Sequence, residues 1–239
     1  MPFRSSVSII ASPRTRVGKT LLARLLIDFQ RQEGRAVAAF DLNAGDGALA
    51  QFAPALTTVS EIAGVKGQMA LFDRLIADDG TTKIVDLGHQ SFEAFFTLAH
   101  HIGFTEEAVR RGIAPAILYV ITPDATSVEA FRGLRRRFPE AVLAPVHNDI
   151  FGPAQHRDKY EPTESGTLLA RLPVLAPRVR KYIEKPPFSF ADEELAAADM
   201  PSAVRDELQH WLKRVYREFR ELDLRVLLAD LQSSIRLES

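Results

Sequence analysis

The chain has 239 residues, of which 46% are hydrophobic and 26% are charged, and its formal net charge is −1. This length and composition fit one large α/β domain, or one domain with a helical extension. So small a net charge excludes recruitment of nucleic acid or of an anionic membrane by the overall field of the protein. The chain contains no cysteine, which excludes disulfides, thiolate metal sites and a cysteine nucleophile.

The N-terminal segment has no pattern of an export signal or of a membrane span. Its short apolar stretch ends before Arg14, whereas a secretory core needs roughly 7–15 apolar residues and a membrane helix about 20. The lack of cysteine also fits a reducing compartment. We therefore expect a cytoplasmic protein.

Short β-branched apolar runs alternate with helical stretches over the first 150 residues, which is the pattern of βαβ units. The expected strands are residues 7–11, 36–40, 83–87, 116–121 and 141–146, with a last short strand near 168–172. The expected helices are residues 21–32, 68–78, 91–111 and 124–137, and the segment 151–166 is typical of a loop. We therefore predict an α/β fold with a mostly parallel central sheet and helices on both faces.

From residue 191 onward the pattern is helical only. Two apolar stripes share this segment: Val204, Leu208, Trp211, Leu212, Val215 and Phe219, and then Leu224, Leu227, Leu228 and Leu231. Residues 201–239 contain 7 Lys or Arg and 7 Asp or Glu, whereas a membrane-surface helix has a cationic polar face. We therefore expect no membrane binding. The predicted organisation is a domain over residues 1–190 with a C-terminal helical extension, residues 191–239, packed on it.

Residues 12–20 lie between the first expected strand and the first expected helix and end in Gly-Lys-Thr, which is the context of a phosphate-binding loop. Backbone N–H groups at a helix N-terminus point at phosphates. Gly18 allows close approach of the main chain, Lys19 reaches the outer phosphates, and the Thr20 hydroxyl holds Mg²⁺. Thr15, Arg16 and Val17 complete the predicted binding loop for ATP and Mg²⁺. The alternative is a helix start with a solvated lysine.

The loop departs from the pattern G-x-x-x-x-G-K-[ST], because Pro13 stands where the first glycine is expected. It resembles the deviant loop K-G-G-x-G-K-[ST] of the ParA/MinD ATPases, in which a signature lysine stands five residues before the phosphate lysine. Arg14 occupies that position here, and Thr15 and Arg16 replace the two inner glycines. Residues 15–20 also match the T-x-V-G-K-T core of dethiobiotin synthetase, a relative in the same superclass.

The ParA/MinD resemblance implies a P-loop NTPase fold and an ATP-dependent homodimer in which Arg14 reaches the partner's phosphates. The alternatives for Arg14 are an exposed side chain or an ion pair within the chain. The family's second strand ends in Asp-x-Asp, and the second carboxylate orients or activates the attacking water. Here Asp41 matches the first position, but Asn43 stands at the second, and an amide cannot act as a base. Asp46 lies close by and could take the role of the missing second carboxylate, but nothing in the sequence establishes that it does. Slow ATP hydrolysis is therefore expected.

The resemblance extends to other landmarks over about residues 5–190. Asp86 matches the carboxylate that supports Mg²⁺ at the end of a strand, residues 121–130 match a T-x-P-E/D-x-x-S segment, and Asn148 matches the asparagine that reads the base. The implied roles are catalytic for Lys19, Arg14, Asp41 and Asn43, and metal-binding for Thr20, Asp41 and Asp86.

The leading hypothesis is thus an ATP-dependent dimerisation switch that acts in DNA partitioning or in positioning a cellular assembly. Alternatives are a nucleotide-binding protein with little or no hydrolysis and a dethiobiotin-synthetase-like ligase. Non-specific DNA or a protein is the expected partner, and ATP is favoured over GTP. Two basic clusters are candidate DNA contacts, or else solvated helix faces: Arg132, Arg135, Arg136 and Arg137, and Arg178, Arg180 and Lys181.

Overall fold

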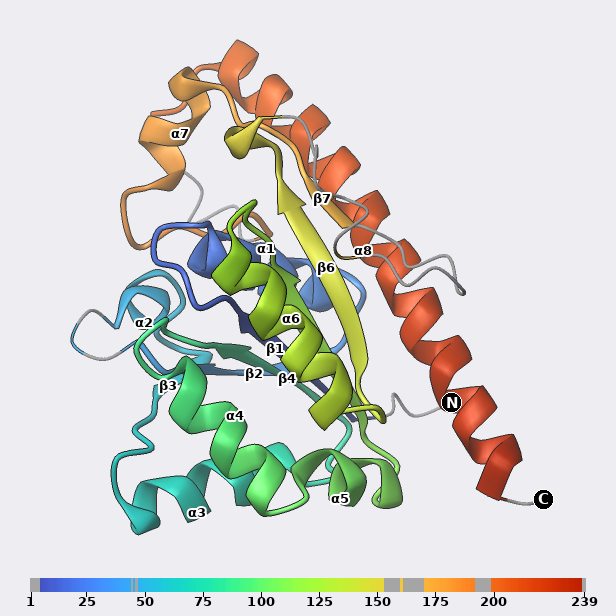
Figure 1. The fold of residues 1–239 in the computed structure, drawn as a ribbon. Helices are drawn as coiled ribbons and strands as arrows, with labels where there is room; N and C mark the ends of the chain where they lie inside the picture. Colours follow the sequence, from blue (N-terminus) through green and yellow to red (C-terminus); the bar gives the residue numbers. More distant parts are fainter. Residues whose placement is uncertain are drawn as a thin grey trace.

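A seven-stranded sheet forms the centre of the computed structural model, and its strands are parallel at every pairing (Figure 1). The structure describes residues 5–43, 45, 47–152, 160, 170–191 and 199–237, and it describes side chains as far as residue 228. The strands are β1 (Ser6–Ala11), β2 (Ala36–Asp41), β3 (Thr57–Val59), β4 (Thr81–Asp86), β5 (Ala114–Val120), β6 (Val142–Asn148) and β7 (Ala170–Leu172). Their order is β3-β2-β4-β1-β5-β6-β7. The predicted parallel sheet is confirmed.

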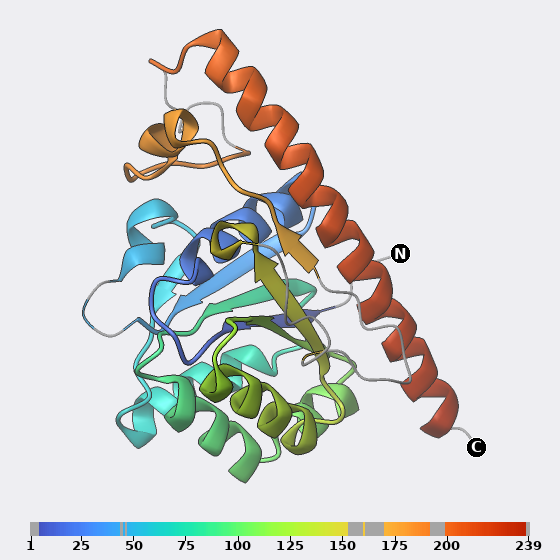
Figure 2. The same cartoon turned by 45° about the horizontal axis from the view of Figure 1, so that its top comes forward.

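Helices cover both faces of this sheet, as predicted. They are α1 (Lys19–Gln32), α2 (Ala48–Phe52), α3 (Val65–Leu75), α4 (Phe92–His101), α5 (Phe104–Arg110), α6 (Ala125–Arg137), α7 (Pro177–Ile183) and α8 (Ser202–Leu237), with a 3₁₀ turn, η1 (Asp149–Phe151). One apolar core joins α1, α7 and α8 to one face, and a second joins α3 to α6 to the other (Figure 2). In β1, Ile9 and Ile10 enter different cores, because successive side chains of a strand point to opposite faces.

The expected element bounds need four corrections. The single helix expected over residues 91–111 is two helices, because Gly103 between them adopts φ 62°, a left-handed conformation that ends a helix. The short elements α2, β3 and α7 were not expected, and none is long enough to show a periodic pattern. The loop expected over 151–166 lies mostly outside the described residues.

The C-terminal segment forms one 36-residue helix, α8. Its first apolar stripe enters the core that also contains residues of α1, with Leu208, Trp211 and Phe219 all buried. Residues of the second stripe remain exposed: Leu224, Leu227 and Leu228. Within the described part of the chain, no helix has the length and apolar character needed to cross a membrane.

Candidate functional site

The loop of residues 12–18 joins β1 to α1 at the carboxyl edge of the sheet, where β1 is the central strand and lies between β4 and β5. Gly18 adopts φ 97°, and a Cβ atom at this position would lie 2.7 Å from Nδ2 of Asn148. The position therefore requires glycine. Arg16 has φ 56° and is the non-glycine residue with positive φ in the described chain, at a place where the resembled loop has glycine. Such a conformation costs on the order of 1 kcal/mol.

Lys19 begins α1, and its ammonium group is bound to its own loop. Its Nζ donates a hydrogen bond to the carbonyl oxygen of Arg14 at 2.6 Å. Burial lowers the pKa of Lys19, and the negative charge of Asp86 opposes that effect. A buried cation whose one hydrogen-bond partner among the described residues is a neutral carbonyl group is well suited to receive an anion.

Thr20, one residue on, is bonded to the carboxylate at the end of β4. Its hydroxyl donates to Oδ2 of Asp86 at 2.7 Å, and the same oxygen accepts from Nδ2 of Asn43 at 3.0 Å. The other carboxylate oxygen, Oδ1, is buried and has no hydrogen-bond partner. Burial raises the pKa of Asp86 to about 6, and the neighbouring charge of Asp41 adds to this rise.

Asp41, at the end of β2, is fully buried and both of its oxygens are occupied. Oδ1 accepts from the backbone and side-chain nitrogens of Asn43, at 3.0 and 2.8 Å. Oδ2 accepts from the backbone N–H groups of Leu49 and Ala50, at 2.8 and 3.2 Å, in the first turn of α2. Asp41 therefore holds the segment after β2 in place, whereas Asp46 lies outside the described residues.

The oxygen atoms near Thr20 fit a magnesium ion. Mg²⁺ binds through one or two protein oxygens and takes its other ligands from water and phosphates. The Thr20 hydroxyl and the unpartnered Oδ1 of Asp86 supply such oxygens. Among the described residues there is no cluster of three His, Cys, Asp or Glu that would hold a metal by protein ligands alone. Asp41 is less available, because each of its oxygens already accepts two hydrogen bonds.

Arg14 pairs within the chain, which is one of the alternatives expected from the sequence. Its Nε donates to Oδ1 of Asp124 at 3.1 Å, and its Nη2 contacts the same oxygen. Asp124 also caps α6 by accepting from the backbone N–H of Ser127 at 3.1 Å. The contact with Arg14 holds the pKa of Asp124 well below its usual range. The ion pair therefore fastens the loop to the start of α6.

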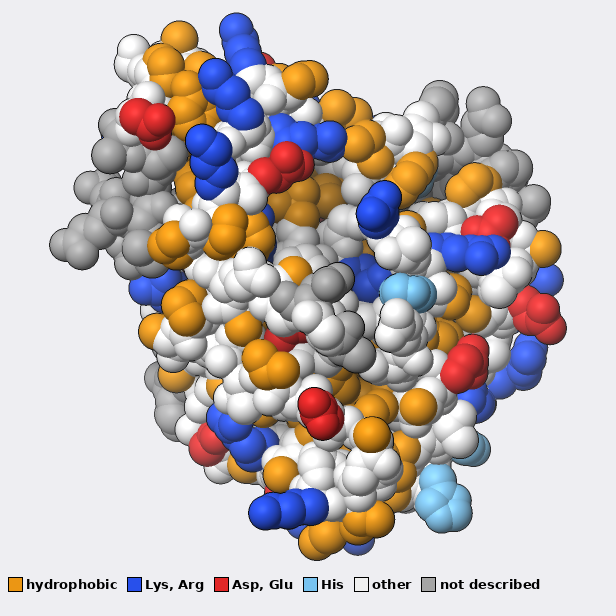
Figure 3. All heavy atoms as spheres, turned by 90° about the vertical axis from the view of Figure 1, so that its left-hand side faces the viewer, with side chains coloured by type: hydrophobic (Ala, Val, Ile, Leu, Met, Phe, Trp, Pro, Cys, Tyr) orange, Lys and Arg blue, Asp and Glu red, His pale blue; other side chains and the backbone are white. Residues whose placement is uncertain are grey.

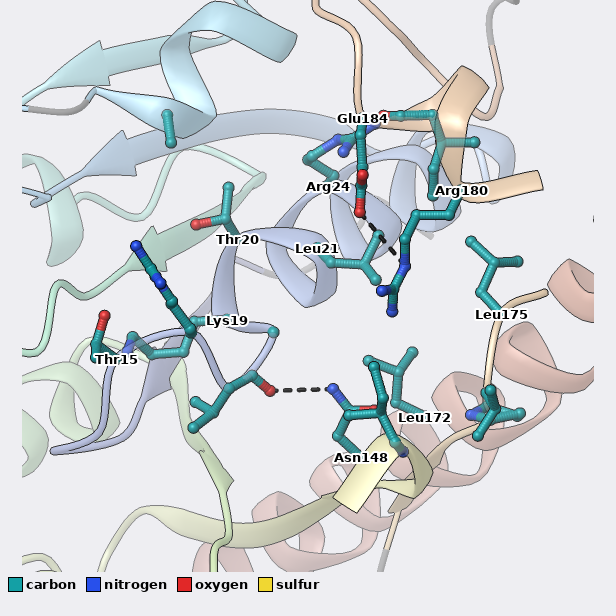
Figure 4. A pocket seen from close by; sticks show the side chains of 18 of the residues that line it. Thr15, Lys19, Thr20, Leu21, Arg24, Asn148, Leu172, Leu175, Arg180 and Glu184 are labelled. Atoms are coloured by element: carbon teal, nitrogen blue, oxygen red, sulfur yellow. Dashed lines mark hydrogen bonds and ion pairs between the residues drawn. The ribbon is translucent and has the colours of Figure 1, made fainter. Parts of the chain in front are cut away.

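A cavity of about 610 Å³ opens from this loop towards α7 and α8. Pockets for small molecules and cofactors have volumes of roughly 300–1,000 Å³. Of the residues expected to bind nucleotide, this cavity brings together Thr15, Arg16, Val17, Gly18, Lys19, Thr20 and Asn148, along with Asn43. Figure 4 labels four of them: Thr15, Lys19, Thr20 and Asn148. Arg14, Asp41 and Asp86 are not among its lining residues.

Sequence reasoning missed part of the cavity wall. These additional lining residues include Trp211 and, as labelled in Figure 4, Leu21, Arg24, Leu172, Leu175, Arg180 and Glu184. They come from α1, β7, the loop after β7, α7 with its C-cap residue, and α8, so no local spacing in the sequence groups them. The helical apolar stripe of the C-terminal segment identified Trp211 as a packing residue but gave no sign of its place beside the cavity.

The two basic clusters differ in how far their charge is balanced. In α6, Arg132 and Arg136 are exposed, and Arg135 lies over the ring of Phe131, 5.0 Å from its centre. In the second cluster, Arg178 pairs with Glu207 at 2.5 Å and Arg180 with Glu184 at 3.4 Å. On the face shown in Figure 3, basic side chains are interspersed with acidic and hydrophobic ones.

No family model matches the chain, and no curated protein matches it. Solved structures do. A chain of the MinC:MinD cell division protein complex of Aquifex aeolicus is 14% identical, with 90% of this chain and 96% of that chain covered and a TM-score of 0.52. A nucleotide-binding protein in complex with ADP from Archaeoglobus fulgidus is 14% identical, with 89% and 88% covered and a TM-score of 0.47. The pNOB8 ParA bound to nonspecific DNA is 10% identical, with 95% and 99% covered and a TM-score of 0.47. The predicted ParA/MinD resemblance is confirmed at the level of the fold.

Proposed function

We propose that this chain, which shares its fold with the MinD-type proteins, binds Mg·ATP and acts as an ATP-dependent dimerisation switch with slow hydrolysis. The observation that carries the proposal is the arrangement of Lys19, Thr20 and Asp86. In the described part of the chain, an ammonium group hydrogen-bonded to a loop carbonyl and to no other group lies beside a hydroxyl–carboxylate pair with one unpartnered oxygen. These groups suit a phosphate chain and its magnesium ion, and the cavity leaves room for the rest of a nucleotide.

In this proposal Lys19 binds the outer phosphates, and Thr20 and Asp86 hold Mg²⁺. The ion, when bound, neutralises charge that develops on the transferred phosphoryl group. Asp41 positions the segment that begins at Asn43, since its oxygens accept from backbone groups there and in α2. Arg14 would contact a partner's phosphates only after leaving Asp124.

A nucleotide-binding protein with little turnover is the second candidate, and the position of Asn43 favours it. Its amide donates to the carboxylates of both Asp41 and Asp86 and cannot take a proton from water. A measured rate of phosphate release separates the two candidates. We propose that the partner is non-specific DNA or a protein assembly. The exposed arginines of α6 are the observation that most favours DNA.

Nucleotide affinity and molecular mass, measured together, test the proposed function. We would titrate the full chain with Mg·ATP and with Mg·ADP while following mass by light scattering. The matched variants are Lys19→Ala and Lys66→Ala, the latter at an exposed position of α3. Micromolar binding and an ATP-specific dimer, both lost only in Lys19→Ala, are expected. Failure of the wild-type chain to bind either nucleotide would refute the proposal.

A further inference from the structure

The cavity is longer than the phosphate site at its end. Beyond the loop it is bounded by apolar side chains: Leu172 at the end of β7, whose Cδ2 also lies 3.8 Å from a Cβ atom built at position 18, Leu175 in the loop after β7, and Trp211 of α8. If phosphates occupy the loop end, as in the proposed function on which this inference rests, the ribose and base of a nucleotide must lie in this part beyond the loop. The residues around it therefore decide how the base is held.

Asn148, the residue expected to read the base, already has protein partners. Its Nδ2 donates to the carbonyl oxygen of Val17 at 3.1 Å, and its Oδ1 accepts from the backbone N–H of Ile150 at 3.2 Å. Nδ2 would also lie 2.7 Å from any Cβ atom at position 18. In this arrangement Asn148 fixes the phosphate loop against β6, and another group has to cover the base.

Arg180 is placed to do so. It lies on α7, and its guanidinium group points into the cavity, on the side opposite Leu172 and Asn148 (Figure 4). Glu184, the residue that follows the last residue of α7, pairs with its Nε at 3.4 Å and also lines the cavity. A guanidinium group is planar and stacks on aromatic rings, which an ammonium group on a flexible stem does not do.

We infer that Arg180 stacks on the nucleobase, that Leu172 faces the base from the other side, and that Glu184 positions the guanidinium group. Stacking of this kind is tolerant of the base, since every base has a π-face. Arg180 therefore contributes affinity for the nucleoside portion of the ligand and none for the phosphates. This gives Arg180 a role in ligand binding and separates it from Arg178 and Lys181, with which the sequence grouped it as a DNA-binding cluster.

The test compares a nucleotide with a ligand that has no base. Calorimetric titration of the full chain with Mg·ATP and with Mg·tripolyphosphate would be made on wild type, Arg180→Ala, Arg180→Lys and Glu184→Gln. Arg178→Ala is the matched control, because Arg178 lies on the same helix, is exposed, and is paired outside the cavity with Glu207. Lys19→Ala is the control for phosphate binding. Circular dichroism and Tm confirm that each variant is folded.

We expect Arg180→Ala to weaken ATP binding by about 3- to 30-fold, the range of a cation–π contact, with tripolyphosphate binding unchanged. Arg180→Lys should lose most of the same affinity although the charge is kept, and Glu184→Gln should lose less. Equal losses for both ligands would place Arg180 at the phosphates and overturn the inference. An unchanged ATP affinity in Arg180→Ala, with Lys19→Ala still defective, would overturn this inference alone. A wild type that binds neither ligand would overturn the proposed function along with it.

Discussion

The ammonium group of Lys19 donates a hydrogen bond to the carbonyl oxygen of Arg14, five residues earlier in the same loop, at 2.6 Å. The side chain of Arg14 is in turn bound to Asp124 at the start of α6. The phosphate loop thus holds its own lysine, and α6 holds the loop. A phosphate group that binds Lys19 therefore competes with a loop carbonyl for the ammonium group.

Replacement of Lys19 by methionine should separate stability from binding. Burial lowers the pKa of Lys19, so its charged form costs stability in the folded chain. That cost is present at pH 7 and disappears only as the pH rises towards the ordinary lysine pKa of about 10.4. We expect the unfolding free energy of Lys19→Met to lie within about 1 kcal/mol of the wild-type value. The variant loses the hydrogen bond to the loop carbonyl, but it also loses the cost of burying a charge. ATP, which should raise the Tm of wild type, should not raise that of the variant.

Urea unfolding with and without Mg·ATP measures both effects, and Lys66→Met at an exposed position is the control. Suppose that, without Mg·ATP, the unfolding free energy of Lys19→Met is several kcal/mol below that of wild type. Lys19 would then be a residue that stabilises the fold in the absence of ligand.

Conversion of Asn43 to aspartate should expose the cost and the benefit of a third carboxylate. Nδ2 of Asn43 lies 2.8 Å from Oδ1 of Asp41 and 3.0 Å from Oδ2 of Asp86. In Asn43→Asp, attraction becomes repulsion, and we expect a loss of about 2 kcal/mol of unfolding free energy without magnesium. Because a cation offsets the added charge, Mg²⁺ should restore part of the lost unfolding free energy. A carboxylate that activates water should raise ATP turnover on the order of 100-fold.

Asn43→Ala distinguishes the causes, since it removes the same hydrogen bonds without adding a charge. We expect it to be less destabilised than Asn43→Asp in the absence of Mg²⁺ and to gain no turnover. Equal turnover in wild type, Asn43→Ala and Asn43→Asp would mean that the residue at position 43 does not limit hydrolysis.

Replacement of Asp124 by asparagine should release Arg14 while preserving the cap of α6, because asparagine is also a good N-cap residue. The pKa of Asp124 is lowered by Arg14, by Thr122 and by the backbone of Ser127. A carboxyl group with a lowered pKa in the folded state stabilises the protein above its ordinary pKa of about 4, and this contribution is lost as the pH falls below that value. The Tm of Asp124→Asn should therefore be below that of wild type at pH 7, and the difference should narrow below about pH 4.

Thermal unfolding at a series of pH values provides the measurement, with Asp73→Asn at an exposed position of α3 as the control. A difference that stays constant down to pH 3 would mean that the Arg14–Asp124 charge pair does not contribute. If Arg14 also acts on a partner's phosphates, as proposed, Asp124→Asn should form the ATP-dependent dimer at a lower protein concentration.

The sequence predicts the phosphate end of the site because of the geometry of a parallel sheet. Asp41 and Asp86 end β2 and β4, and these strands are neighbours, so their carboxyl ends meet at one edge next to the loop after β1. Thr20 and Asp86 are 66 residues apart, yet the strand pattern alone places them at the same edge. The alternation of strands and helices along the chain, together with the rules for connecting parallel strands, is enough to place these residues at one edge of the sheet.

Other contacts could not be predicted, because they depend on where a helix lies and which rotamer a side chain adopts. Arg14 and Asp124 are 110 residues apart, and nothing in their local sequence distinguishes this ion pair from a contact with a partner chain. Arg180 follows Arg178 in a basic stretch, yet one side chain points into the cavity and the other pairs with α8. The difference arises because two positions that are two residues apart on a helix point in nearly opposite directions, about 200° apart around its axis.

Trp211 tests whether the C-terminal helix is an independent extension or part of the folded domain. Its side chain is 5% exposed in the core shared with α1, its Nε1 donates to the carbonyl oxygen of Pro173 at 2.9 Å, and it lines the cavity. We expect Trp211→Ala to lower the unfolding free energy by about 3–5 kcal/mol, the usual cost of removing a buried aromatic side chain. Trp211→Phe keeps most of the volume but loses the hydrogen bond, so its loss of unfolding free energy should be smaller. Gln209→Ala, at an exposed position, should change the unfolding free energy little.

If α8 is part of the domain, urea unfolding of all three variants follows one transition by circular dichroism. In Gln209→Ala, which keeps the chain's single tryptophan, fluorescence should report the same transition. A separate early transition, with the rest of the chain retaining wild-type stability in Trp211→Ala, would show that α8 unfolds independently and that the boundary near residue 191 divides two folding units.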